Sequence, residues 1–182
     1  MSYPGPRLAL RSRDMELRRI PSGALAGAVA AAVWAAQQPL DKRLFGSDYD
    51  DVELLGKLVT RDSGWQAAGL AIHMANGAAF GAVYALLRPF LPGPPQVAGV
   101  AAGLGEHLAT WPLTALVDRD LAGDRRAFAQ SAWRHALFGL VLGELERRLN
   151  PAGQFEPLEQ VPVSSNGHGN IEHAAAGATE AP

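Results

Sequence analysis

The sequence predicts an all-α protein: a four-helix transmembrane bundle built from two similar helical hairpins, with an amphipathic interfacial helix and a disordered C-terminal tail. Two observations support this prediction. Four apolar stretches are separated by polar links or Pro/Gly-rich breakers, and each stretch contains the small-residue pattern Gly-x-x-x-Gly. The four helices are expected at about 20–38, 66–88, 96–117 and 131–149, and the interfacial helix at about 48–60.

The length and the charge balance narrow the possible classes of protein. The chain has 182 residues, which suits one domain with terminal extensions, and its 48% apolar content stands against only 19% charged residues. A net charge of −2 argues against a nucleic-acid partner, because phosphate recognition needs clustered Lys and Arg. The chain has no cysteine, which excludes disulfides, a thiolate nucleophile, iron–sulfur clusters and Cys-based zinc sites.

The first predicted helix follows a basic N-terminal arm, residues 1–19, which contains five Arg. The stretch 20–36 has no charge, but it is only marginally long enough to cross a bilayer. A basic segment before an apolar run is also typical of an export signal. The similar stretch at 97–117, which cannot be a signal, favours a retained helix.

The second and third predicted helices are apolar nearly all round, whereas a soluble helix normally has one apolar stripe. The stretch 67–87 passes the length test for a span well. The stretch 97–117 also passes, with an interruption at Glu106 and His107. Between them, the proline-rich breaker 89–95 predicts an antiparallel helical hairpin.

The fourth apolar stretch is the weakest candidate for a span, because only 136–143 within 132–149 is cleanly apolar. Its charged side chains form a polar face: Arg134, Glu144, Glu146, Arg147 and Arg148. An amphipathic fourth helix leaves a soluble four-helix bundle as an alternative architecture.

The link 39–64 predicts a short amphipathic helix at the membrane interface. Its apolar residues recur at helical spacing: Tyr49, Val52, Leu55, Leu58 and Val59. Ser47 or Asp48 is the expected N-cap. The helix dipole favours anions in the first turn, which is expected to hold Asp50, Asp51 and Glu53. These acids lack the following glycine of a calcium loop, so they are interpreted as a solvated helix start.

The glycine pattern indicates a duplicated hairpin, with copies at roughly 20–88 and 96–150. The second and fourth helices share the longer pattern His-x-x-x-Gly-x-x-x-Gly, which begins at His73 and at His135. Small residues at every fourth position let helix backbones approach closely in lipid. The candidate packing residues are Gly23, Gly27, Gly77, Gly81, Gly99, Gly103, Gly139 and Gly143.

Six polar residues in or beside the predicted spans form the candidate site: His73, Asn76, Glu106, His107, His135 and Glu144. Such residues are costly in lipid and face a partner or water. The leading interpretation is a hydrogen-bonded cluster that fixes helix register. A second interpretation is a path for protons or a small solute, because His and Glu exchange protons near neutral pH. A third places haem or a metal at His73 and His135; no other cofactor and no catalytic residue is expected.

The two ends of the chain differ in charge. The tail 151–182 has no Lys or Arg and is rich in Gly, Pro, Ala and Ser, which predicts disorder. In a four-span arrangement the Lys and Arg totals on the two sides are equal, so the positive-inside rule gives no orientation. The five Arg of the arm 1–19 favour a cytoplasmic N-terminus.

Three short motifs occur in a suggestive order: His73-x-x-x-Gly77-x-x-x-Gly81-x-x-Tyr84, then Gly99-x-x-x-Gly103 running to Trp111-Pro112, then Trp133-Arg134-His135. Over roughly 20–150 this order resembles the YagU-like small multi-pass inner-membrane proteins of unknown function. The alanine-rich first helix and Glu106 depart from that pattern. The resemblance implies a multi-pass bacterial membrane protein with no assigned activity.

The sequence therefore predicts a non-enzymatic structural or accessory protein of a bacterial-type cytoplasmic membrane. Its expected partners are the lipid bilayer and either a second copy of the chain or another membrane protein. One alternative function is a small proton-linked transporter or channel that uses Glu106, His107 and His73. The other alternative is the soluble helical bundle.

Overall fold

The structure, a computed structural model, describes residues 6–151, with side chains from residue 19 onward. Within that range the chain is helical and contains no strand, which confirms the all-α class. The α-helices are α1 (Pro6–Phe45), α2 (Asp51–Val59), α3 (Trp65–Leu87), α4 (Pro95–Val117) and α5 (Arg125–Leu149). Two short 3-10 helices follow α3 and α4: η1 (Arg88–Phe90) and η2 (Arg119–Leu121). Apart from Pro151, the tail predicted to be disordered lies outside the described residues.

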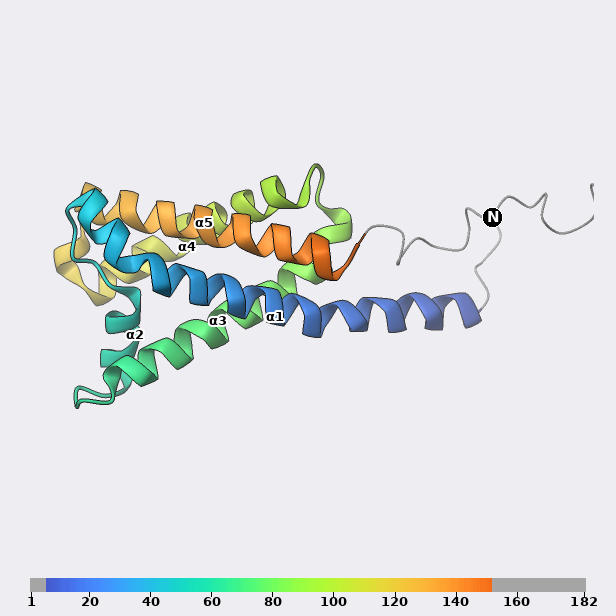
Figure 1. The fold of residues 1–182 in the computed structure, drawn as a ribbon, viewed down its shortest axis with the longest axis horizontal. Helices are drawn as coiled ribbons and strands as arrows, with labels where there is room; N and C mark the ends of the chain where they lie inside the picture. The colour runs from blue at the N-terminus through green and yellow to red at the C-terminus, as the bar shows by residue number, and fades with distance from the viewer. Residues whose placement is uncertain (1–5, 152–182) are drawn as a thin grey trace, which may run out of the picture. The chain divides into compact units, whose positions relative to one another are not determined.

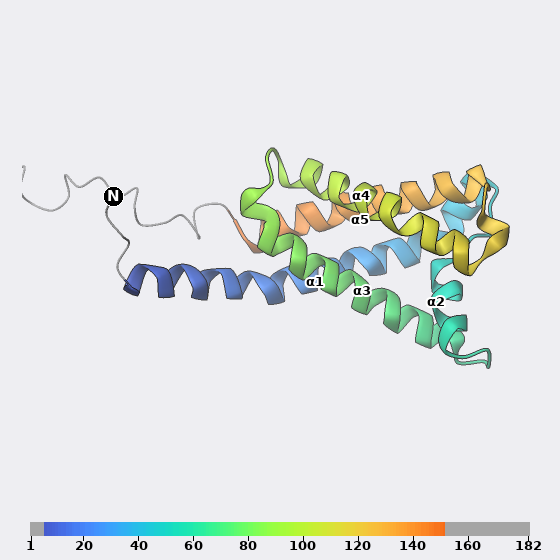
Figure 2. The same cartoon turned by 180° about the vertical axis from the view of Figure 1, so that it is seen from behind.

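Helix α1 packs along both α3 and α5, and α4 packs along α5 (Figure 1). Helix α2 packs on α3, near its first turns (Figure 2). The α1–α2 link, the start of α3 and the α4–α5 link lie at one end of the bundle. The α3–α4 turn and the end of α5 lie at the other end.

Helix α1 is longer than the predicted range 20–38, and Pro21 and Pro39 lie inside it. An internal proline removes one backbone hydrogen bond. A helix therefore continues beyond the proline when other contacts hold the residues that follow it. Asp41 supplies such a contact, because it is 1% exposed and accepts hydrogen bonds from α5. Gly46, with φ at 59°, follows the last residue of α1 and ends the helix.

The starts of α2 and α5 are fixed by aspartate caps. The prediction of Ser47 or Asp48 as the cap of α2 is wrong, since the cap is Asp50, whose backbone is extended and whose Oδ1 accepts from the N–H of Glu53 at 2.9 Å. Helix α5 begins before the predicted residue 131 because Asp124 accepts from two N–H groups of its first turn, at 2.8 and 3.1 Å.

The turn between α3 and α4 is held by side chains that bond to backbone carbonyls. Arg88 donates to the carbonyls of Leu91 and Gly93, both at 2.7 Å, and Gly93 has φ at 80°. The hydroxyl of Tyr84 donates to the carbonyl of Pro95 at 2.6 Å. These bonds hold a reversal of chain direction between α3, which packs on α1, and α4, which packs on α5.

Glycines lie where α1 meets α3 and where α4 meets α5. A Cβ added to Gly27 would lie 2.8 Å from the carbonyl carbon of Gly77 and 2.9 Å from Cα of Gly81. A Cβ added to Gly139 would lie 2.8 Å from Cα of Val100. Because close-packed backbones cannot absorb such overlap, any larger residue would push the helices apart. The same constraint applies at Gly23, Gly77, Gly81, Gly99, Gly103 and Gly143.

The interior of the bundle holds large polar side chains, whereas many large apolar side chains lie on its surface. Its buried apolar residues are mostly small, and Ala26, Ala30 and Ala31 are at most 1% exposed. The largest fully buried side chains are Arg134, Leu142, His107, Gln130, Glu146, Asp41 and Ser131. Large apolar side chains on the long helices instead face outward, among them Leu25, Val83, Leu108, Leu116 and Leu140.

Alanine at Gly27 should destabilise the protein, whereas alanine at Gly105 should not. Nothing lies within 4 Å of a Cβ placed on Gly105, in contrast to Gly27. We expect G27A to lower the free energy of unfolding by about 1–3 kcal/mol through overpacking. We expect G105A to leave it unchanged or raise it by up to about 1 kcal/mol through helix propensity. Thermal unfolding followed by circular dichroism compares the two, and a G27A protein as stable as wild type would contradict the close helix approach.

Candidate functional site

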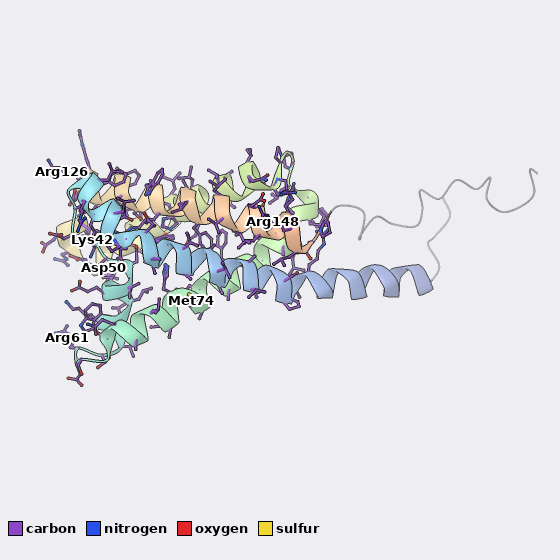
Figure 3. The ribbon with its side chains drawn as sticks, viewed as in Figure 1. Lys42, Asp50, Arg61, Met74, Arg126 and Arg148 are labelled. Carbon is purple, nitrogen blue, oxygen red and sulfur yellow. The ribbon has the colours of Figure 1, made fainter. Side chains whose placement is uncertain are left out.

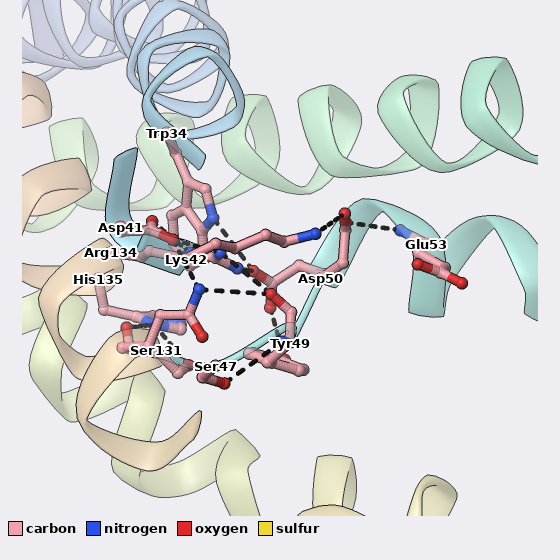
Figure 4. A network of polar contacts seen from close by, with 12 residues as sticks. Trp34, Asp41, Lys42, Ser47, Tyr49, Asp50, Glu53, Ser131, Arg134 and His135 are labelled. Carbon is pink, nitrogen blue, oxygen red and sulfur yellow. Dashed lines mark hydrogen bonds and ion pairs between the residues drawn. The ribbon is translucent and has the colours of Figure 1, made fainter. Parts of the chain in front are cut away.

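Arg134 of α5 is completely buried and binds two carboxylates from other parts of the fold (Figure 4). Its Nε and Nη2 donate to the two oxygens of Asp41 on α1, both at 2.6 Å. Its Nη1 donates to Oδ2 of Asp51, the first residue of α2, at 2.7 Å. Nη2 also donates to the carbonyl of Tyr49 at 3.1 Å. One guanidinium therefore ties α5 to α1, to α2 and to the link between them.

The two carboxylates that bind Arg134 have further donors. Gln130 donates from Nε2 to Oδ1 of Asp41 at 2.6 Å, and Gln37 donates to the other oxygen of Asp41. Asp51 accepts from the indole N–H of Trp34 at 3.1 Å and from the hydroxyl of Tyr49 at 2.5 Å. Charge-assisted bonds of this kind offset the cost of removing the carboxylates from water.

A second acidic residue of the link, Asp50, lies at the edge of this network. Its Oδ2 accepts from Nζ of Lys42 at 2.8 Å. Burial alone would raise the pKa of the Asp50 carboxyl, but the hydrogen bonds from Lys42 and from the N–H of Glu53 outweigh burial and hold that pKa below its ordinary value of 3.8. Burial, reinforced by the charge and the hydrogen bond of Asp51, raises the pKa of the Tyr49 hydroxyl far above its usual range.

A histidine–glutamate pair lies next to the Arg134 network. Nδ1 of His135 lies 2.8 Å from the carbonyl of Ser131, to which it must donate, since a carbonyl only accepts. Nε2 of His135 lies 2.9 Å from Oε2 of Glu106 on α4. With Nδ1 protonated, both facing atoms would be acceptors unless a proton lies between them. His135 and Glu106 therefore share one proton, as an imidazolium–carboxylate pair or as a neutral acid bonded to neutral imidazole.

Two further histidines, His107 and His73, lie beside this pair. Nδ1 of His107 lies 3.2 Å from the hydroxyl of Ser131, and its ring centroid lies 5.0 Å from that of His135. His73 of α3 contacts the indole of Trp34, with ring centroids 5.0 Å apart, and the same indole lies 4.5 Å from His135. Nε2 of His73 and Nε2 of His107 are buried without a hydrogen-bond partner among the described residues.

A cavity of about 290 Å³ separates α3 from α4 and gives access to both groups of residues. The polar residues that line it are Asp51, His73, Asn76, Glu106, Thr110 and Thr114. The aromatic residues that line it are Trp34, Tyr49, Phe80 and Phe138. The side chain of Glu106 is 37% exposed, so its carboxylate can meet a molecule that enters this cavity.

The structure brings together five of the six residues predicted for the site. His135 contacts Glu106 and His107 directly, and His73 and Asn76 line the same cavity as Glu106. Glu144 lies elsewhere: it accepts from Gln96 at 2.7 Å and pairs with Arg147 and Arg148. The inclusion of Glu144 is therefore wrong, because its place on α5, nine residues beyond His135, corresponds to about 13 Å along the helix.

The sequence analysis missed the Arg134 network. It assigned Arg134 to a solvated face of the fourth helix and Asp51 to a solvated helix start, but Arg134 is fully buried and the Asp51 side chain is 13% exposed. The sequence did contain one indication that Arg134 is buried, since it is the only residue with a permanent charge between 127 and 143. It also shares a helical stripe with the buried residues Ala127, Gln130, Ser131, Phe138 and Leu142.

A metal or haem at His73 and His135 gains no support from the geometry. Both rings pack against Trp34 rather than converging on a shared open position. In the described part of the chain, no group of three His, Cys, Asp or Glu residues is arranged to hold a metal ion.

Comparisons with known proteins identify no relative. The chain matches no protein-family model, no curated protein and no solved structure. The resemblance to YagU-like proteins therefore stays a prediction from short motifs.

Replacing Arg134 by methionine should be strongly destabilising. R134M leaves Asp41 and Asp51 without their shared counter-charge, and breaking a buried pair in this way costs about 3–5 kcal/mol. The exposed Arg126, on the same helix, is the matched control, and R126M should change the free energy of unfolding by less than about 0.5 kcal/mol. Chemical denaturation of the purified proteins measures both values. Equal stability of the two variants would contradict the role assigned to Arg134.

The lowered pKa of Asp50 predicts a specific loss of stability in acid. Because its folded-state pKa lies below the unfolded value of 3.8, its contribution is complete above that value and disappears as the pH falls through the folded-state pKa. An asparagine in place of Asp50 would keep the N-cap but not the charge, so D50N should lose less stability than wild type between about pH 5 and pH 2. Unfolding midpoints across this range test the difference, and parallel pH profiles would rule out the Lys42–Asp50 contribution.

Proposed function

We propose that this chain is an integral membrane protein that crosses the bilayer with α1, α3, α4 and α5, and that it acts as a structural or accessory component. The observation that supports this most directly is the inverted distribution of polarity. Charged and polar side chains such as Arg134, Asp41 and His107 are buried, whereas leucine and valine side chains face outward on the long helices. Contiguous exposed apolar surface of this kind marks contact with lipid or with another protein.

Within the part of the chain that the structure describes, two helices meet the criteria of length and apolar composition for a membrane span, and these are 19–45 and 65–90. Only 33% and 28% of the residues in their most apolar windows are buried. The core helix of a soluble protein would be mostly buried, so the low values favour lipid over the soluble bundle. For these two helices, length and apolar composition are the basis for proposing a membrane span.

The case for α4 and α5 as further spans rests on where their charges lie. Glu106 is the only charged residue of α4, and it pairs with His135. Between 127 and 143 of α5, the only permanent charge is the buried Arg134. Figure 3 places Lys42, Asp50, Arg61 and Arg126 toward one end of the bundle and Arg148 toward the other. An uncharged outer band between charged ends fits a bilayer.

Self-association and duplication are further parts of the proposal. The glycine-lined crossings α1–α3 and α4–α5 fit helix packing in lipid, where small residues replace the missing hydrophobic drive. These crossings fall within the two proposed hairpin copies. We place the protein in a bacterial-type inner membrane with a cytoplasmic N-terminus, in line with the YagU-like motifs and the basic arm. Its exposed apolar surface then contacts lipid, a second copy or another membrane protein.

A proton-linked transporter or channel is the second candidate function. The shared proton of His135 and Glu106 favours it, because this pair lines a cavity and is flanked by His107 and His73. In such a protein, E106Q should abolish proton flux into vesicles while leaving the fold intact. In a purely structural cluster, E106Q should lower stability and change no flux.

The number of spans can be tested with single cysteines, since the chain has none of its own. Three exposed positions serve: Ser63 before α3, Pro92 between α3 and α4, and Ala122 between α4 and α5. After an alkaline carbonate wash establishes that the protein stays in the membrane, a membrane-impermeant maleimide is applied to spheroplasts. Four spans with a cytoplasmic N-terminus predict labelling of S63C and A122C but not of P92C.

The control for access is labelling after the cells are opened, when all three cysteines should react. If only α1 and α3 cross the membrane, A122C shares the behaviour of P92C and the four-span proposal is wrong. Release of the protein by carbonate would leave the soluble bundle as the architecture.

A further inference from the structure

The cavity between α3 and α4 presents several hydrogen-bond acceptors, and one of them, on His73, has no donor of its own. His73 is 8% exposed, and its Nε2 lacks a partner. The ring of His73 also donates to the backbone of Ala31, which leaves Nε2 as the acceptor of a neutral imidazole. The partly exposed carboxylate of Glu106, one oxygen of which bonds to His135, is a second acceptor, and the exposed amide of Asn76 can both accept and donate. His73 and Glu106 therefore favour a ligand that donates hydrogen bonds.

The charges around the cavity leave one negative charge uncompensated. Three carboxylates, those of Asp41, Asp51 and Glu106, face one guanidinium, that of Arg134, and the single proton shared with His135. Lys42 does not change this balance, because it is paired with Asp50. A net charge inside a helical bundle is costly, and a bound monovalent cation would neutralise it.

The shape and lining of the cavity favour an organic cation over a metal ion. Four aromatic side chains line the cavity, those of Trp34, Tyr49, Phe80 and Phe138, and aromatic faces attract ammonium groups. A bare alkali or alkaline-earth ion would need several converging oxygen ligands, and among the described residues no group of three His, Cys, Asp or Glu residues is arranged to hold a metal ion. A volume of about 290 Å³ lies at the lower limit of small-molecule sites, so the ligand is small.

We propose that this cavity binds a small primary amine in its ammonium form, with the charged head at Glu106, Asn76 and His73 and an apolar body against Trp34, Phe80 and Phe138. The N–H groups of the ammonium bond to Nε2 of His73 and to the carboxylate of Glu106, and its charge balances the surplus negative charge of Asp41 and Asp51 beside Arg134. The cavity lies within one copy of the chain, so the proposal holds whether or not all four helices cross the membrane.

Benzylamine is the probe, titrated near neutral pH by isothermal calorimetry into the full chain in mild detergent, with protein-free micelles as the blank. Benzyl alcohol has nearly the same shape but no charge, and benzyltrimethylammonium has the charge but no N–H. We expect benzylamine to bind at least about tenfold more tightly than either, because it alone makes charge-assisted hydrogen bonds. This comparison uses only the wild-type protein.

The variant E106Q removes the charge and keeps the shape of the side chain, and it should weaken benzylamine binding by at least about tenfold. E144Q is the matched control, since Glu144 lies outside the cavity in a cluster with Arg147 and Arg148, and it should bind as wild type does. The proposal is overturned if benzylamine does not bind, or if benzyl alcohol or benzyltrimethylammonium binds as tightly as benzylamine. Unchanged binding by a folded E106Q protein overturns it equally.

Discussion

A buried guanidinium cannot be left without carboxylate partners, and in this protein that requirement falls on Arg134. Its partners lie far away in the sequence: Asp41 near the end of α1 and Asp51 at the start of α2. Satisfying one side chain therefore fixes the end of α1 against α5, and the link to α2 against both. It also accounts for the continuation of α1 past Pro39, because Asp41 must remain helical to reach Arg134. Removing either partner would leave a charge in the interior, so the three elements are positioned together.

Glycine contacts and the polar network act on different parts of the same helices. Gly27 and Gly81 bring α1 and α3 into backbone contact, and Gly99 and Gly139 do so for α4 and α5. Helix α3 packs along α1, and α4 packs along α5. As a result α3 and α4 do not pack along each other, and a cavity lies between them. The site is thus a consequence of how the two helix pairs close. Its histidines and Glu106 face inward near the centres of α3, α4 and α5, where a polar group needs a partner or a ligand.

The sequence was sufficient to predict what depends on local pattern. The four long helices, the short helix before α3 and the turn near Pro92 follow from hydropathy, helical spacing and proline content. The residues His73, Glu106, His107 and His135 stood out because ionisable groups are rare in apolar stretches. The pairing of Arg134 with Asp41 and Asp51 could not be predicted, since it joins residues 93 and 83 positions apart. A charge on an amphipathic helix is ordinarily solvated, and only the packing of α5 against α1 reveals that this one is not.

The most direct test of this account is a double-mutant cycle between Asp41 and Arg134. The free energy of unfolding would be measured by reversible denaturation for wild type, D41L, R134M and the double variant. If the pair positions α1 against α5, the double variant should lose about 2–3 kcal/mol less than the sum of the two single losses. Each single variant leaves one buried charge without its partner, whereas the double variant removes both charges of the pair. Losses that add within about 0.5 kcal/mol would show that the two residues act independently and would contradict the account.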